Sequence, residues 1–101
     1  MLIVIADALL SPEQRAKFEP LAAKMIAPSR AEPGCLAYWY AFDLLEPMRL
    51  RVVEIWADAA ALEFHFSTPH LKEFSQALRS LGPRDLKITV RELGAERKLP
   101  S

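Results

Sequence analysis

The sequence has few of the residues that constrain a fold covalently or loosen it, with one cysteine and three glycines among 101 residues. Because Cys35 is alone, no internal disulfide framework can form. No apolar run approaches the ~18 residues that a membrane-spanning helix requires. The apolar start, residues 1–5, is short and lacks the basic region of a signal peptide. These absences predict a cytoplasmic protein without membrane contact.

A dominant sign of charge is also missing, since 13 basic residues balance 13 acidic ones. With no basic stripe along the chain, nucleic-acid binding is not expected. The sequence also lacks a glycine-rich phosphate loop, a GxSxG elbow around a nucleophilic serine and an HExxH zinc motif. We therefore expect neither a cofactor nor a nucleic-acid partner.

Apolar side chains are what the sequence has in quantity, at 51% of its residues. A chain of this length forms one domain, which we place at residues 1–95, followed by a polar tail at 96–101. A domain this small buries roughly two-thirds of the surface that its unfolded chain exposes. The surplus of apolar side chains therefore predicts oligomerisation.

Hydrophobic periodicity predicts seven elements in the order βαββααβ. Short β-branched or aromatic runs bounded by turn residues predict strands, and apolar positions spaced near 3.6 predict helices. Strands are expected at 2–9, 35–42, 50–56 and 86–91. One helix is expected to follow Ser11, with an apolar face reaching Ile26, and two more to run from the caps Asp58 and Thr68 to about residues 66 and 81.

Two segments carry more specific expectations. Ser11 and Gln14 form a capping box with Pro12 at the first helical position. Pro20 lies inside this helix, where it removes a hydrogen bond and clashes with the preceding turn at a cost of about 3 kcal/mol. We therefore expect a kink at Pro20 or a helix that begins later. The strand at 2–9 is apolar at both alternating sets of positions, which predicts burial on both faces.

The element order is that of an α+β, ferredoxin-like fold, a four-stranded antiparallel sheet with its helices on one face. The opposite face, with Val53 and Ile55, carries part of the apolar set too. Left open to water it would form a patch on the order of several hundred Å², which is rare on monomers. We therefore predict a two-fold homodimer in which the sheets pack face to face.

In such a fold the natural pocket for a small molecule lies between the helices and the sheet. Glu54 is predicted to face it, between Val52 and Trp56 on the same side of strand 50–56. Burial raises the pKa of a carboxyl that is not paired, so Glu54 is a candidate proton acceptor near neutral pH. The alternative is a structural glutamate bonded to a helix terminus, a histidine or an arginine. The sequence does not separate the two.

His65 and His70 flank the break between the two later helices, and either can titrate near physiological pH. Both are catalytic candidates, although His70 also has a structural alternative as an interface residue. As a metal pair they are disfavoured, because a separation of five positions does not place them on one helix face. No acidic or cysteine partner follows them at ligand spacing either. We therefore predict no metal site.

Aromatic residues are dense in the middle of the chain. Most are expected in the core or at the dimer contact, but some can wall a pocket for a flat substrate, with a tyrosine hydroxyl as a polar contact. The substrate-binding candidates are Trp56, Tyr38, Tyr40 and Phe74. Cys35 has no basic neighbour in the sequence to lower the pKa of its thiol, so we expect an inert, buried side chain there.

Several segments taken together resemble the antibiotic biosynthesis monooxygenase domain family. Glu32–Leu36 and the following Tyr38 resemble the family's EPGCLxY entry to its second strand. Residues 49–56 resemble its third strand, and residues 61–74, which include His65, are similar to its ALxxHxxSPHFKxF segment. The likeness covers nearly the whole chain and is most specific from residue 32 to residue 74.

The resemblance implies the dimeric α+β barrel fold. For some members it also implies cofactor-independent oxidation of phenols, anthrones or quinols, in which a substrate anion reacts directly with O2. On this sequence Glu54 or a histidine would take the proton, while Trp56 and Tyr38 would hold the ring. The leading hypothesis is a cofactor-independent monooxygenase of a small aromatic substrate.

The same fold also hosts haem-degrading enzymes and isomerases. Haem-degrading members look like an Asn, Trp, His trio, and Trp56 matches the tryptophan. Asp7 lies in the region of the asparagine, and Ser75 and Gln76 lie near the place of the axial histidine, which argues against haem. Two alternatives stay open. One is an isomerase that uses the same pocket. The other is a non-catalytic ligand-binding dimer, with a pocket filled by side chains and Glu54 held by fixed partners.

Overall fold

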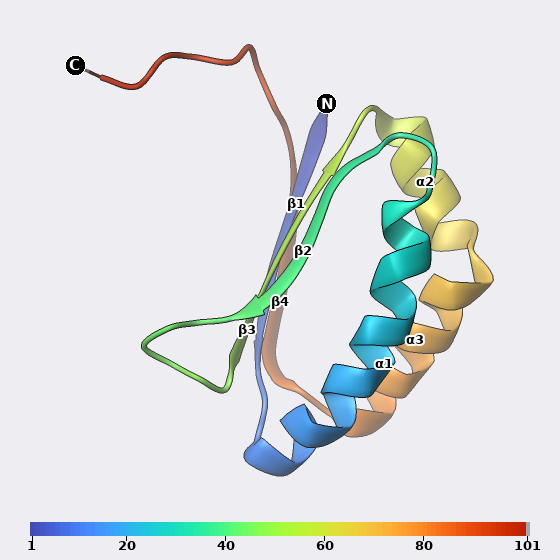
Figure 1. Ribbon diagram of the computed structural model, residues 1–101, viewed down its shortest axis with the longest axis vertical. Helices are drawn as coiled ribbons and strands as arrows, with labels where there is room; N and C mark the ends of the chain where they lie inside the picture. Colours follow the sequence, from blue (N-terminus) through green and yellow to red (C-terminus); the bar gives the residue numbers. More distant parts are fainter. Residues whose placement is uncertain (101) are drawn as a thin grey trace.

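The computed structural model describes residues 1–100 and has the predicted order of elements (Figure 1). Its seven elements are β1 (Leu2–Leu9), α1 (Pro12–Arg30), β2 (Cys35–Phe42), β3 (Arg49–Trp56), α2 (Ala59–Ser67), α3 (Pro69–Leu81) and β4 (Arg84–Glu92). The predicted α+β, ferredoxin-like fold is confirmed.

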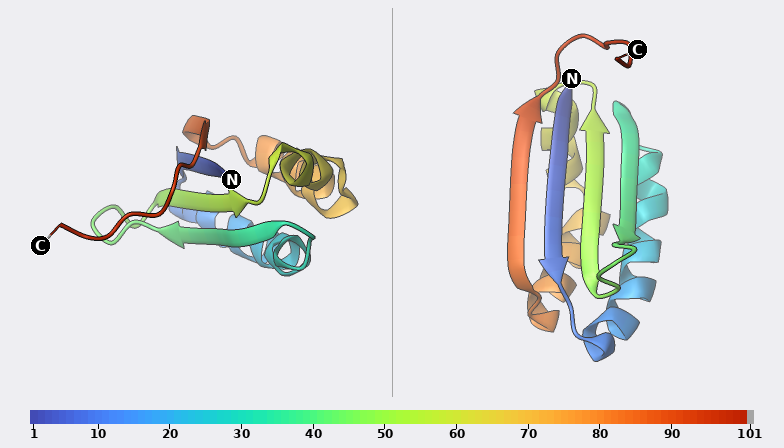
Figure 2. Two further views of the ribbon diagram at one scale, coloured as in Figure 1. Left: turned by 90° about the horizontal axis from the view of Figure 1, so that it is seen from above. Right: turned by 90° about the vertical axis from the view of Figure 1, so that its left-hand side faces the viewer.

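The strands form one antiparallel sheet in the order β2-β3-β1-β4. Figure 2 shows this sheet from one face with all the helices behind it, and Figure 1 shows it edge-on with the helices on one side. The register places Glu54 of β3 between Val4 of β1 and Tyr38 of β2. The carboxylate therefore projects from the middle of the sheet toward the helix layer.

Helix α1 begins with the predicted capping box, in which Ser11 and Gln14 exchange backbone and side-chain hydrogen bonds. The helix begins at Pro12, so the expectation of a later start is wrong. It runs through Pro20 and also through Pro28. Both prolines are exposed, so the carbonyls left without an N–H partner lie on the solvent side of the helix. Water can satisfy them there, which lowers the cost of each proline.

Thr68 makes the break between the last two helices. Its hydroxyl donates to the carbonyl of His65 at 2.7 Å and accepts from the backbone N–H of Leu71 at 3.4 Å. One residue therefore closes α2 and caps α3, as an N-cap threonine can. The break turns the chain, so α3 does not continue the axis of α2 (Figure 1).

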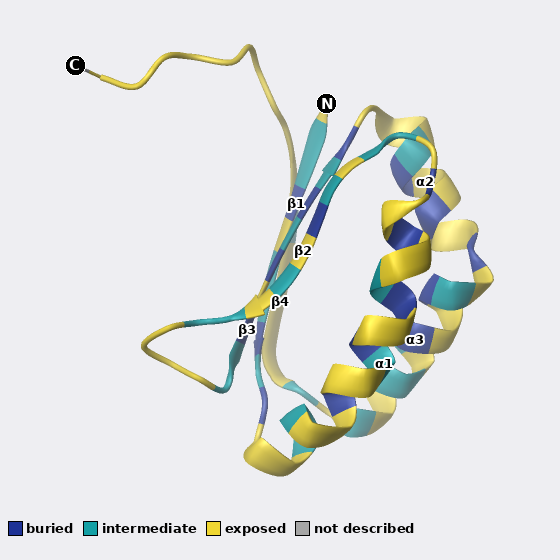
Figure 3. Cartoon of the chain, in the orientation of Figure 1, coloured by how far each residue is buried: buried dark blue, intermediate teal, exposed yellow. Residues whose placement is uncertain are grey.

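The two faces of the sheet differ in burial (Figure 3). The helix side carries the core, which includes Val4, Leu50, Val52 and Trp56. On the other side Ile5 is 45% exposed and Trp39 56% exposed. Strand 2–9 was expected to be buried on both faces, and within one chain it is buried on one only.

Strand β4 is exposed on both faces, where only one wet face was expected. Val90 and Ile88 pair with Val4 and Ala6 and so face the helix side. About half of each of these two side chains is exposed nevertheless. The helix layer lies over the other three strands and leaves this edge strand open (Figure 2).

Within residues 1–100, no helix has the length and apolar character that crossing a membrane would require.

Candidate active site

A cavity of about 120 Å³ lies between the sheet and helices α2 and α3. An engineered apolar cavity of roughly 150 Å³ holds benzene, so this space suits a single small ring. Most of its wall is apolar, and the polar side chains that reach it are Asp7, Tyr40, Glu54, His65 and Ser75. Leu86 and Ile88 of the uncovered strand β4 border it on one side. The cavity is where the ferredoxin-like fold predicts a ligand site.

Glu54 has a raised pKa. The residue is only 8% exposed, and this burial raises the pKa of its carboxyl to about 7. The indole Nε1–H of Trp56 donates to Oε1 at 3.0 Å and partly offsets the shift, while the negative charge of Glu32 adds to it. No arginine or lysine within residues 1–100 forms an ion pair with Glu54. The carboxyl can therefore exchange a proton with a ligand near neutral pH.

His65 is 1% exposed and also lines the cavity. Its ring lies 4.6 Å from that of Trp56 and 5.2 Å from that of Tyr38, centroid to centroid. Nε2 lies 3.2 Å from the hydroxyl of Tyr38, and Nδ1 lies 2.8 Å from Oε2 of Glu32. Burial lowers the pKa of the imidazole, against the effect of the Glu32 carboxylate. The ring is therefore neutral at neutral pH.

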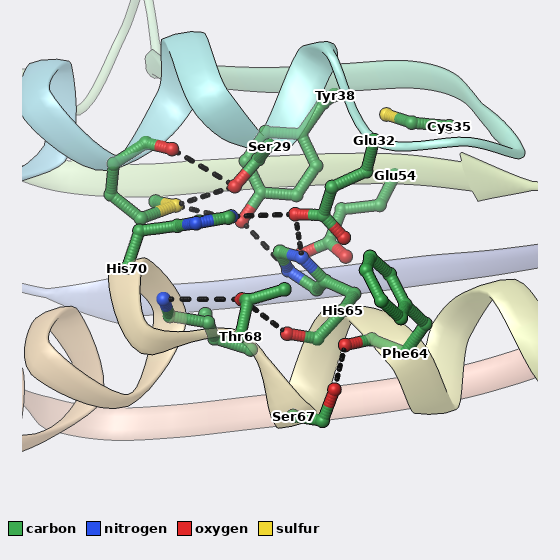
Figure 4. Close-up of polar contacts among 12 residues, drawn as sticks. Ser29, Glu32, Cys35, Tyr38, Glu54, Phe64, His65, Ser67, Thr68 and His70 are labelled. Atoms are coloured by element: carbon green, nitrogen blue, oxygen red, sulfur yellow. Dashed lines mark hydrogen bonds and ion pairs between the residues drawn. The ribbon is translucent and has the colours of Figure 1, made fainter.

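Glu32 is the residue of this site that the sequence analysis missed as a functional candidate. Its buried Oε2 accepts from Nδ1 of His65 and from Nε2 of His70, at 2.8 Å and 2.6 Å (Figure 4). The three residues come from the turn before β2, from α2 and from α3. Five positions on one continuous helix would separate the two histidines by about 140°, and the break at Thr68 removes that separation.

The argument against a metal pair therefore needs correction. It looked for an acidic partner after the histidines, and the partner, Glu32, precedes them by more than 30 residues. The EPGC motif was visible in the sequence, but nothing local to it indicates contact with a helix that begins at residue 59. The only usable signal was that the two likeness segments, around 32–36 and 61–74, are both polar where they meet the predicted core.

A metal ion can be reached by this triad, since its three ligand atoms lie within 4.8 Å of one another. Oε1 of Glu32 is buried and has no hydrogen-bond partner among residues 1–100. However, both histidine nitrogens lie at hydrogen-bond distance from the single atom Oε2, so each points an N–H at the carboxylate instead of a lone pair at a shared ion. The observed geometry fits a hydrogen-bonded triad better than a metal centre.

Glycine 34 lets the turn that carries Glu32 lie against α2. Its φ of +83° is in the left-handed region, and a Cβ there would lie 2.6 Å from Cβ of Ala61. Both facts exclude a side chain without local movement. The glycine of the EPGC motif therefore sets the distance between Glu32 and His65.

The aromatic candidates divide into two groups. Tyr40 and Phe74 line the cavity, as expected of substrate contacts. Trp56 and Tyr38, expected to hold the ring of the substrate, lie behind the wall and are 0% and 1% exposed. They reach the cavity through their contacts with Glu54 and His65. His70 also lies away from the cavity wall, beside a surface groove that Lys24 and Glu73 border.

Cys35 lies at the start of β2 and is partly buried. Burial and the nearby charge of Glu32 raise the pKa of its thiol. A raised pKa leaves little thiolate at neutral pH, and the thiolate is the reactive form. This agrees with the expected inert cysteine.

Comparison with known proteins gives one consistent result. Residues 1–77 match the family model described as antibiotic biosynthesis monooxygenase. The chain is 34% identical over 89 residues to uncharacterized protein sll1783 of Synechocystis sp., which covers 86% of this chain but only 60% of that longer protein. It is 32% identical over 89 residues to probable quinol monooxygenase YgiN of Escherichia coli, covering 78% of this chain and 86% of that one. A crystal structure from Deinococcus radiodurans superposes with a TM-score of 0.90 at 30% identity, over the whole of both chains.

Proposed function

Because the chain belongs to the antibiotic biosynthesis monooxygenase family, we propose that it oxidises a small phenolic, anthrone or quinol-type substrate with O2 and without a cofactor. One observation carries the proposal: a buried carboxyl, that of Glu54, has a pKa of about 7 beside a cavity of the size of an aromatic ring. Such a group is half ionised near neutral pH and can both take and return a proton.

The proposed reaction is balanced for an anthrone-type methylene as CH2 + O2 → C=O + H2O. Glu54 takes one proton, and the carbanion that forms adds O2 to give a peroxide anion, which takes the proton back. The second hydrogen then leaves the same carbon as a proton while the O–O bond breaks, which leaves a carbonyl and releases water. An apolar wall supports these steps because it keeps bulk water from the anion.

Oxygen consumption tests the proposal. Purified protein is expected to consume O2 with members of a panel of quinols and anthrones, and kcat/KM is expected to rise with pH through about 7, as the carboxylate of Glu54 forms. Glu54→Gln keeps the shape and removes the base, so the rate is expected to fall by about 10²-fold or more. Glu63→Gln, at an exposed position on α2, is the control and keeps full activity. No turnover across the panel, or full activity of Glu54→Gln, would contradict the proposal.

An isomerase is the second candidate, and a specific observation favours it. Glu54 and His65 both border the cavity, and two proton-exchanging groups on one ligand can move a hydrogen between two carbons. Substrate conversion at the same rate without oxygen would identify the isomerase. The non-catalytic alternative predicted a filled pocket and a Glu54 with fixed partners, whereas the cavity is open and Glu54 has one hydrogen bond, from Trp56.

For assembly we propose a homodimer through the uncovered face of the sheet. Ile5 and Trp39 on that face are about half exposed in one chain. Val53 and Ile55, which the sequence analysis placed on the dimer face, lie on the same side of β3 and are partly exposed. A second copy packed on this face would remove these apolar groups from water.

A further inference from the structure

A row of five hydrogen-bonded side chains crosses the protein from the cavity to the surface, and the proposed reaction at Glu54 does not use it. Its members are Tyr40, Tyr38, His65, Glu32 and His70. The successive donor–acceptor distances are 3.4, 3.2, 2.8 and 2.6 Å. Tyr40 borders the cavity, and the side chain of His70 is 23% exposed at the other end. Figure 4 shows the part of the row from Tyr38 to His70.

The direction of these hydrogen bonds follows from Glu32. An ionised carboxylate can only accept, so the nitrogens of His65 and His70 that face Oε2 must both donate. His65 then carries its hydrogen on Nδ1, and its Nε2 has a free lone pair. The partner of Nε2 is the hydroxyl of Tyr38, which must donate to it.

The direction continues to the cavity. The hydroxyl of Tyr38 also lies 3.1 Å from the sulfur of Met25, but a thioether is a weak acceptor and the imidazole nitrogen is the better one. Once Tyr38 donates to His65, its oxygen is free to accept from the hydroxyl of Tyr40. The oxygen of Tyr40 then has lone pairs left for a ligand and no hydrogen left to give.

We propose that Glu32 is a positioning residue that fixes His65 as the Nδ1–H tautomer and, through Tyr38, makes Tyr40 a hydrogen-bond acceptor for the hydroxyl of a substrate. His70 anchors Glu32 from the solvent side. The inference rests on the proposed function for the identity of the ligand, because it selects substrates that carry a free hydroxyl over those in which it is blocked. It assigns a function to the EPGC glutamate that is independent of Glu54.

A ¹⁵N spectrum of the imidazoles tests the first half of the inference on the unaltered protein. His65 is expected to show the Nδ1–H tautomer at pH 7.5, with an unprotonated Nε2. An Nε2–H tautomer or an imidazolium at His65 would overturn the inference. This measurement needs no substrate and no turnover, so the inference can stand even if oxygen consumption is never seen.

Binding of phenol and of anisole, its methyl ether, tests the second half. One net hydrogen bond corresponds to about a two- to tenfold preference, so the protein is expected to bind phenol more tightly than anisole by this factor. In Glu32→Gln the amide can donate to Nδ1 of His65, which reverses the row, and the preference is expected to disappear together with a switch of His65 to the Nε2–H tautomer. Equal binding of phenol and anisole by the unaltered protein would contradict the inference.

Glu73→Gln is the matched control, since this exposed residue borders the same groove as His70 but is outside the row. It is expected to keep both the tautomer and the preference for phenol. If Glu32→Gln lost the preference while His65 kept its tautomer, the effect would be general disorder of the site and the inference would fail.

Discussion

Glu54 carries a free-energy cost at neutral pH because its charged form is buried among apolar side chains. Its pKa is raised from the usual 4.5 to about 7. Between these two pH values the folded state binds more protons than the unfolded state, so stability falls as pH rises and the whole cost is present above pH 7. The shift corresponds to about 3 kcal/mol at most. A proton acceptor in this place therefore reduces stability.

Glu54→Gln is accordingly expected to raise the free energy of unfolding at pH 8 by about 2 kcal/mol. The glutamine oxygen can still accept from Nε1–H of Trp56, so that hydrogen bond is retained. The gain is expected to shrink toward zero as the pH is lowered to 4.5, where the wild-type carboxyl is protonated in the folded state. Urea unfolding at several pH values measures both effects.

Glu63→Gln provides the baseline for these measurements, because that side chain is exposed. It is expected to change stability by no more than about 0.5 kcal/mol at any pH. A stability gain for Glu54→Gln that did not depend on pH would show that the carboxyl is not neutralised by burial.

Among the connecting elements, the turn before β2 has the tightest packing constraint. In Gly34→Ala the new Cβ meets that of Ala61 at 2.6 Å, in a backbone with φ of +83°. In Gly82→Ala, at the C-cap of α3, the φ of +69° is similar but nothing lies within 4 Å. The two glycines therefore separate the cost of the left-handed backbone from the cost of the contact.

Gly82→Ala is expected to cost about 1–2 kcal/mol, the penalty for alanine in the left-handed region. Gly34→Ala is expected to cost at least about 1 kcal/mol more, since overpacking adds 1–3 kcal/mol. Adding Ala61→Gly to Gly34→Ala removes the clash and should recover that difference. Thermal or urea unfolding of the four proteins measures this, and equal losses for the two single variants would show that the contact with Ala61 carries no energy.

The sequence was sufficient for the elements and their caps, because those depend on neighbours a few residues apart. Ser11 with Gln14 and the stop at Thr68 are local signals, and the structure reproduces them. Pro20 was misleading because its cost depends on which side of the helix faces water, which the local sequence does not state. The alternation around Glu54 was also local and correctly placed it toward the helices.

The triad could not be predicted in the same way, because it depends on distant segments. Glu32 meets His65 across 33 residues and His70 across 38. That contact requires the sheet, the turn at Gly34 and the break at Thr68 all to be in place. Similarly, the wet helix-side face of β4 depends on how far the helix layer extends over the sheet, which periodicity does not encode.

For the whole molecule, the uncovered face of the sheet determines the expected assembly. The protein is expected to have twice its chain mass of 11.4 kDa in light scattering at micromolar concentration. Trp39→Lys places a charge at the centre of that face, where Trp39 is 56% exposed, and burying this charge in a dimer costs several kcal/mol. The variant is therefore expected to scatter as a monomer while keeping its fold by circular dichroism.

Phe64→Lys is the control for that experiment, because Phe64 is similarly exposed, at 52%, but lies on α2 in the helix layer. It is expected to leave the dimer intact. A wild-type protein with the mass of a single chain would exclude the proposed homodimer at that concentration.

The chain order of the polar row also bears on how the protein is made. Glu32 and His70 close a loop of 38 residues, whereas Thr89 of β4 meets Ile5 of β1 across 84. The longer closure costs only ~0.7 kcal/mol more in chain entropy, so the larger difference is one of timing. During synthesis the ribosome releases residues 32–70 well before β4, which supplies the last wall of the cavity. We expect the Glu32–His65–His70 cluster to assemble on the nascent chain before there is an enclosed space for a substrate.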